Sequence, residues 1–196
     1  MKNFKQARNQ GGFSLVELLL VLAIIAALAV AAFIVYPRVQ AGRNATYESQ
    51  VLSSAQAGVK ALFTTNNYAN LTTTAAYNAE IFPRNMNVEG GTTIENQWGG
   101  LVVASGSTAA GADSATSPTR YFKFVYPNVP TDVCIRLAGA AVQNFGAVLI
   151  GEDAASATAV VNTYDTDEDN NIVDEAAIAL QCKQDSGKAT IVFVSN

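Results

Sequence analysis

The sequence of 196 residues contains no histidine, only two cysteines and few charged residues. The absence of histidine excludes imidazole-based catalytic triads and general bases, and it removes the commonest metal ligand. The chain also lacks a G-x-S-x-G motif that would mark a nucleophile. We therefore expect a protein that is not an enzyme, with a membrane-anchored enzyme kept only as a distant alternative.

Charged residues make up 14% of the chain, and the formal net charge is −4. Lys2, Lys5 and Arg8 all lie within the first 12 residues, so the remainder carries −7. A protein that binds nucleic acid needs a concentrated basic surface. The composition shows no such basic surface. Whether the chain binds DNA or a host surface stays open.

The two cysteines, Cys134 and Cys182, are far apart and do not form a C-x-x-C pair, which argues against zinc-binding and thioredoxin-like sites. A single disulfide is the simpler interpretation, and it implies an oxidising compartment outside the cytoplasm. It would close a loop of 49 residues. The loop-entropy model assigns such a cross-link about 4 kcal/mol of stabilisation.

A long apolar run begins close to the N-terminus. Residues 18–36 contain no charged side chain, whereas residues 1–12 carry three cations and no anion. At about 1.5 Å per residue, a helix that begins at Phe13 is long enough to cross a hydrocarbon core of about 30 Å. The positive charge before the run predicts that residues 1–12 stay in the cytoplasm and that the rest of the chain lies outside.

The junction before this run, GFSLVE at residues 12–17, resembles the class III signal of type IV prepilins. The resemblance implies that a prepilin peptidase cleaves between Gly12 and Phe13, that Phe13 is N-methylated, and that the apolar helix is retained. It also implies insertion into the bacterial inner membrane, contact with the pilus assembly machinery, and polymerisation with copies of the same chain into an extracellular filament.

Glu17 places a carboxylate at the start of this apolar helix. Insertion scales assign such a charge roughly 2.5 to 3.5 kcal/mol at the bilayer centre, and less near the interface. The new amine of Phe13 in a neighbouring subunit can offset this cost and set the register of assembly. The alternative is that Glu17 extends to the membrane interface without a specific partner.

Beyond the apolar run, Pro37 predicts a break or kink, or else a plain helix end at the membrane surface. Apolar residues then recur at helical spacing, with Glu48 placed among the intervening polar positions; the apolar positions are Val51, Ala55, Val59, Leu62 and Phe63. We therefore expect a cleaved leader at 1–12, an assembly helix at 13–37, an amphipathic continuation at 38–66 and a head at 67–196.

The head is expected to be α+β, with the helical spine packed on an antiparallel sheet. Residues 68–100 are predicted to be a connecting loop with a short helical turn near 75–81, and the small-residue stretch 104–118 is predicted to be a surface loop. Short β-prone segments separated by turn residues follow the pattern of strands; they are residues 101–103, 121–126, 147–150, 159–164 and 190–194.

The disulfide-bounded region 134–182 and the final strand resemble the C-terminal part of type IV pilins. The sequences NQWGG at 96–100 and PTDVC at 130–134 look closest to type IVb pilins, whereas the short leader and Phe13 are more typical of type IVa. Trp98, followed by two glycines, is interpreted as a half-buried anchor at a tight turn, with stacking on a sugar as the alternative.

An acidic segment carries oxygen ligands at alternating positions, namely Asp165, Asp167, Asp169 and Asn171. The pattern is that of a calcium loop, but Asn170 replaces the usual glycine and Ala176 the bidentate glutamate. A solvated acidic loop is the alternative, so any calcium site would be weak. No other cofactor is expected.

Together these features predict a structural subunit of a type IV pilus, which serves adhesion, motility, conjugation or DNA uptake. A minor pilin or a type II secretion pseudopilin shares the anchor and is the main alternative. The disulfide favours a pilin over a pseudopilin.

Overall fold

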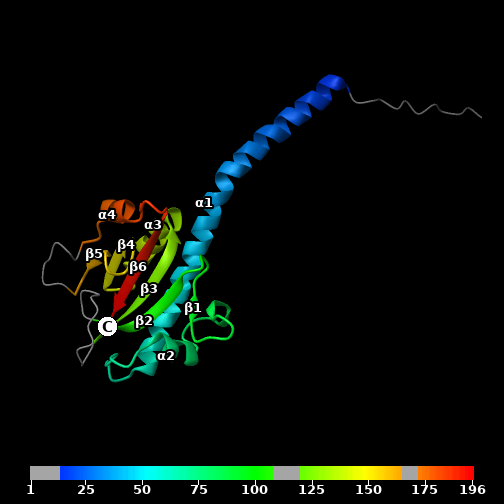
Figure 1. Cartoon of the computed structure of the whole chain (residues 1–196). Helices are drawn as coiled ribbons and strands as arrows, with labels where there is room; N and C mark the ends of the chain where they lie inside the picture. The colour runs from blue at the N-terminus through cyan, green and yellow to red at the C-terminus, as the bar shows by residue number, and fades with distance from the viewer. Residues whose placement is uncertain (1–13, 108–119, 165–171) are drawn as a thin grey trace, which may run out of the picture. The chain divides into compact units, whose positions relative to one another are not determined.

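The computed structural model describes residues 14–107, 120–164 and 172–196 (Figure 1). The chain divides into two compact units, Met1–Gln40 and Ala41–Asn196. The first unit contains the N-terminal part of a single long helix, and the second contains the rest of that helix and the sheet.

Helix α1 extends over Leu15–Leu62 and passes through Pro37 without a break. The predicted break at Pro37 and the alternative of a helix end there are therefore both wrong. A proline removes one amide donor from a helix interior, but long helical segments on both sides supply the other hydrogen bonds. One turn is also linked through its side chains, because Gln40 Nε2 donates to the Tyr36 hydroxyl over 2.7 Å.

The part of α1 in the second unit presents one face to the core. Its buried residues recur at intervals of three or four, which is the spacing of one helix face; they are Ala41, Ala45, Glu48, Val51, Leu52, Ala55 and Val59. One expectation for this segment needs a correction. Glu48 lies on the buried face and not among the exposed polar positions.

Within the described residues, six antiparallel strands form one sheet in the order β1-β2-β3-β6-β4-β5 (Figure 1). They are β1 (Ile94–Glu95), β2 (Leu101–Ser107), β3 (Tyr121–Pro130), β4 (Ala147–Gly151), β5 (Thr158–Asn162) and β6 (Lys188–Ser195). The C-terminal strand β6 lies between β3 and β4, at the centre of the sheet. The predicted antiparallel sheet is confirmed.

Strand β2 continues past the predicted start of the surface loop at residue 104. Ala104 pairs with Phe124, and Ser107 pairs with Tyr121. Both Ala104 and Ser107 are buried. Pairing with the apolar strand β3 decides the conformation here, because small residues have little strand preference of their own. Residues 108–118 of the predicted loop lie outside the described residues.

The main core lies between the sheet and the helices. Aromatic side chains from β3 and β6 form its centre, where Phe124 meets Phe82 and Phe145 edge-on at centroid distances of 5.2 and 6.3 Å. Val51, Leu52 and Val59 of α1 belong to the same cluster. A smaller apolar cluster of Val125, Ala147, Val192 and Val194 is separate from it.

The helices besides α1 are short. Helix α2 covers Thr73–Asn78, a 3₁₀ turn covers Arg84–Met86, α3 covers Thr131–Ala141 and α4 covers Glu175–Gln181. The predicted helical turn near 75–81 corresponds to α2, whereas α3, α4 and the short strand β1 were not predicted. The buried positions of α3 follow helical spacing, so the signal for it was present; they are Val133, Cys134, Leu137, Ala138 and Ala141.

The segment predicted as a connecting loop contributes much of the core, which a loop exposed to solvent would not. Its buried apolar residues are Tyr68, Leu71, Ala76, Ile81, Phe82, Met86 and Ile94. Threonine and asparagine predominate between these residues and conceal the pattern. These residues belong to the same core cluster as buried residues of the sheet and of α1.

Candidate functional site

The first half of α1 is an apolar helix without any core of its own. Its large side chains are exposed throughout the first unit, from Leu15 at 73% to Phe33 at 80% and Tyr36 at 65%. The helix contains a window with a mean hydropathy of 3.3, of which nothing is buried inside the protein. By length and composition the helix can cross a membrane. A surface of this kind requires lipid or other protein chains to cover it.

Glu17 lies in the first turn of α1 and is exposed. A carboxylate at this position interacts favourably with the positive end of the helix dipole. Gly12 and Phe13 lie outside the described residues, so the predicted pairing of Glu17 with the amine of Phe13 stays a prediction. The same holds for the predicted cleavage and N-methylation.

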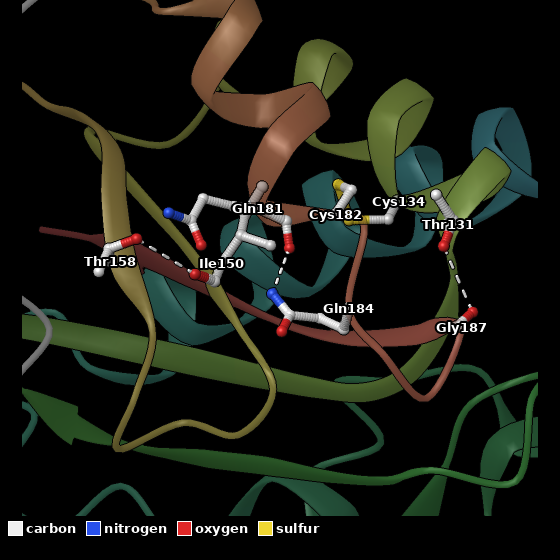
Figure 2. The surroundings of a disulfide bond; sticks show 8 residues. All are labelled: Thr131, Cys134, Ile150, Thr158, Gln181, Cys182, Gln184 and Gly187. Carbon is white, nitrogen blue, oxygen red and sulfur yellow. Dashed lines mark hydrogen bonds between the residues drawn. A yellow bond between two sulfur atoms is a disulfide. The ribbon is translucent and has the colours of Figure 1, made fainter.

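A disulfide joins Cys134 on α3 to Cys182 at the end of α4 (Figure 2). The two Cα atoms are 5.7 Å apart, and both residues are completely buried. This separation is in the normal range for a disulfide. The expected disulfide-bounded region is confirmed, and the bond anchors the short helix α4 to the core through α3.

Hydrogen bonds hold the chain around the disulfide in place (Figure 2). Gln184 Nε2 donates to the carbonyl oxygen of Gln181 over 2.6 Å, and Thr131 Oγ1 donates to the carbonyl of Gly187 over 3.4 Å. The second bond joins the start of α3 to the turn that precedes β6. The first bond is local to the end of α4, and the second ties α3 to the turn that leads into the central strand β6.

Trp98 is held in a tight turn that Asn96 organises. The Asn96 carboxamide oxygen accepts from the amides of Trp98 at 3.0 Å and Gly100 at 2.9 Å, while its Nδ2 donates to the carbonyl of Pro127 at 2.7 Å. Asn96 is buried, Gly99 has a φ of 74°, and the Trp98 ring packs partly buried against the core. This arrangement supports the interpretation of Trp98 as an anchor.

Glu48 is a charged residue of α1 in the second unit whose side chain is completely buried. Neither of its oxygens has a hydrogen-bond partner in the described structure, and neither does the buried hydroxyl of Tyr126. Burial raises the pKa of Glu48 to about 7, and the nearby backbone of Gln97 and hydroxyl of Tyr126 offset this only in part. Burial, together with the Glu48 carboxyl, also raises the pKa of Tyr126.

Sequence reasoning missed this residue because an isolated glutamate among serines looks like a solvated position. The available signal was its spacing, since Glu48 lies three residues before Val51 and seven before Ala55. Those positions share one helix face.

The candidate calcium ligands Asp165, Asp167, Asp169 and Asn171 lie outside the described residues. Within the part of the chain that the structure describes, no group of three or more acidic or cysteine side chains is arranged to hold a metal ion.

An exposed apolar helix that continues into an α+β head with an antiparallel sheet and a disulfide-bounded C-terminal region is the architecture of a type IV pilin. Residues 7–33 match the model of the prokaryotic N-terminal methylation motif. Residues 42–196 match the model described as PilS N terminal, and the chain belongs to this family.

Among solved structures, the head is similar to the crystal structure of a type IV b pilin from Salmonella typhi. The identity is 17%, the match covers 63% of this chain and 77% of the other, and the TM-score is 0.45. Comparison with curated protein sequences finds no match.

Proposed function

We propose that this type IV pilin is a structural subunit of a pilus filament. Its precursor is inserted in the bacterial inner membrane through the apolar part of α1, with residues 1–12 in the cytoplasm. Prepilin peptidase cleaves after Gly12, Phe13 is methylated, and the mature subunit leaves the membrane for an extracellular filament. The head resembles type IVb pilins in the sequences around Trp98 and Cys134.

The observation that carries this proposal is that the large apolar side chains of the first half of α1 are exposed, whereas the second unit has a core of its own. Lipid covers such a helix before assembly, and equivalent helices of other subunits cover it in a filament. Because a bundle of helices excludes both water and lipid, it also favours an ion pair between a charged group such as Glu17 and a group of opposite charge.

Electron microscopy of fibres sheared from the cell surface, combined with mass spectrometry of their N-terminus, tests the proposal. Abundant fibres whose subunit begins with N-methylated Phe13 are the expected result. Scarce copies within fibres made of another pilin would assign the chain as a minor pilin. A soluble monomer that begins after Tyr36 would contradict the proposal.

A further inference from the structure

Three segments of the head that are distant in sequence meet beside the start of β3. Phe122 pairs with Ser195 in the sheet, so the residues just before Phe122 lie next to the C-terminal end of β6. Tyr68 stacks against Phe122 at 4.8 Å and against Phe63 at 5.8 Å, which brings the segment after α1 to the same place. Sheet pairing and aromatic packing therefore fix this juxtaposition.

These segments border a cavity of about 1000 Å³ that is open to solvent. Its described lining residues are Lys60, Thr65, Asn66, Asn67, Arg120, Tyr121 and Asn196. Nearly all of them are polar, in contrast to the apolar linings of most small-molecule sites. The cavity therefore suits a hydrophilic ligand.

Two cations, Lys60 and Arg120, reach this cavity from different segments. No aspartate or glutamate is among its described lining residues, and the single ion pair of the described structure is between Arg84 and Glu80. Residues 41–196 contain eight lysines and arginines against 15 aspartates and glutamates, a net charge of −7. The two cations of this cavity are thus opposite in sign to the net charge of the domain that carries them.

A structural role accounts for only one of these charges. Lys60 lies in the last turn of α1, where a cation stabilises the negative end of the helix dipole. Arg120 lies immediately before β3, outside any helix, so this explanation does not apply to it. A planar guanidinium is suited to bind a carboxylate through two parallel hydrogen bonds.

The remaining groups supply hydrogen bonds and a partly exposed ring. The Asn67 carboxamide oxygen accepts from the amide of Ala69 over 3.2 Å, which orients its NH₂ group as a donor for other partners. The ring of Tyr121 is held against Tyr164 at a centroid distance of 4.8 Å, and the Tyr164 hydroxyl donates to Asn196 Oδ1 over 3.3 Å. Part of the wall is thus ordered before any ligand binds.

We propose that this cavity binds an acidic sugar. Arg120 and Lys60 hold the sugar carboxylate, and the asparagine amides and the Thr65 hydroxyl hydrogen-bond to the ring hydroxyls. The pilin head is then a receptor for carboxylated glycans, a role that does not depend on polymerisation.

The test is titration of the full-length chain in detergent with glucuronic acid, followed by ligand-observed NMR. Glucose and inorganic phosphate serve as parallel probes. We expect glucuronic acid to bind and glucose to bind at least about tenfold more weakly, because it lacks the carboxylate. Arg120→Gln and Lys60→Gln should each weaken glucuronic acid binding by a similar factor.

Lys183→Gln is the matched control, since it removes one exposed cation outside the cavity and should leave binding unchanged. The proposal is overturned if glucuronic acid does not bind, if the control weakens binding as much as Arg120→Gln, or if phosphate binds more tightly than the sugar acid. None of these outcomes affects the proposed role as a filament subunit, because the readout is made on unassembled protein.

Discussion

Glu48 makes the stability of the head depend on pH. Its pKa is about 7 in the folded protein against an ordinary value of 4.5, so the fold favours the neutral acid. The stabilisation is fully present below pH 4.5 and is lost as the pH rises through 7. We expect this one group to lower the free energy of unfolding by about 3 kcal/mol between pH 4.5 and pH 8.

Glu48→Gln should remove this part of the pH dependence, because the amide has nearly the same shape and cannot ionise. Denaturant unfolding of the full-length chain in detergent, from pH 4.5 to 8.5, measures the effect. Glu89→Gln changes an exposed carboxylate and is the control. Identical pH profiles for wild type and Glu48→Gln would contradict the assignment.

Gly100 is required in the turn that holds Trp98. A Cβ atom at this position would collide with the carbonyl of Pro127 and would approach Asn96 Nδ2 to 2.8 Å. Gly100→Ala must therefore shift the turn away from β3 and disturb the buried hydrogen bonds of Asn96. We expect a loss of about 2 kcal/mol or more in the free energy of unfolding.

Gly139→Ala is the matched substitution, because nothing lies within 4 Å of a Cβ atom there and the residue is in helix α3. It should leave the stability unchanged or raise it by up to about 1 kcal/mol. Thermal unfolding followed by circular dichroism separates the two variants. Equal melting temperatures for both would show that the contact at Pro127 is unimportant.

Among the structural elements, α3 and α4 depend most on the disulfide. Helix α4 has seven residues, of which only Ile178 is buried in the core and Ala177 packs partly buried against it, so its own apolar contact is small. The double variant Cys134→Ser, Cys182→Ser should lose about 4 kcal/mol of stability, with α4 and the segment after it exposed first. Hydrogen exchange of amides in 175–187 measures this local opening.

Reduction of the wild-type protein should reproduce the same loss, whereas the double variant should not respond to a reductant. Amides of α1 within the core serve as the internal reference, since we expect them to exchange only on global unfolding. Unchanged protection of 175–187 in the double variant would mean that packing alone holds α4.

The sequence was sufficient to predict the long helix, five of the six strands and the disulfide, because each has a strong local signal. The apolar run of 18–36 and the alternation of turns and β-prone segments are properties of neighbouring residues. Tertiary contacts decided the rest. The 68–100 segment is buried by contact with α1 and the sheet, and Ser107 is in a strand because β3 lies beside it.

The candidate functional residues also divide into those that a local sequence pattern predicts and those that tertiary contacts create. The disulfide was predicted from the number of cysteines and is present in the structure, whereas the roles assigned to Gly12, Phe13 and Glu17 from a short motif stay predictions. The burial of Glu48 depends on β3 and on the turn at Gln97, and the cavity at Arg120 depends on the pairing of β3 with β6. These partners are distant in sequence, so the cavity was not predictable, and helical spacing alone could indicate the face on which Glu48 lies but not what encloses it.

At the scale of the whole molecule, Glu17 connects a single carboxylate to filament assembly. On the proposed function, Glu17 of the membrane-inserted precursor lies near the interface, where water and lipid headgroups reduce the energetic cost of its charge. In the proposed bundle of apolar helices that solvation is lost, and we expect the amine of Phe13 in a neighbouring subunit to replace it. Glu17→Ala should leave cleavage and membrane insertion intact and reduce the yield of filaments at least about tenfold.

Immunoblotting of membrane fractions for the processed subunit, and quantification of sheared fibres, measure the two effects separately. Glu89→Ala removes an exposed carboxylate of the head and should assemble normally. Normal filament yield from Glu17→Ala would show that the apolar surface of α1 alone sets the register between subunits. Loss of the processed subunit itself would instead place Glu17 in recognition by the peptidase, which also contradicts a role confined to assembly.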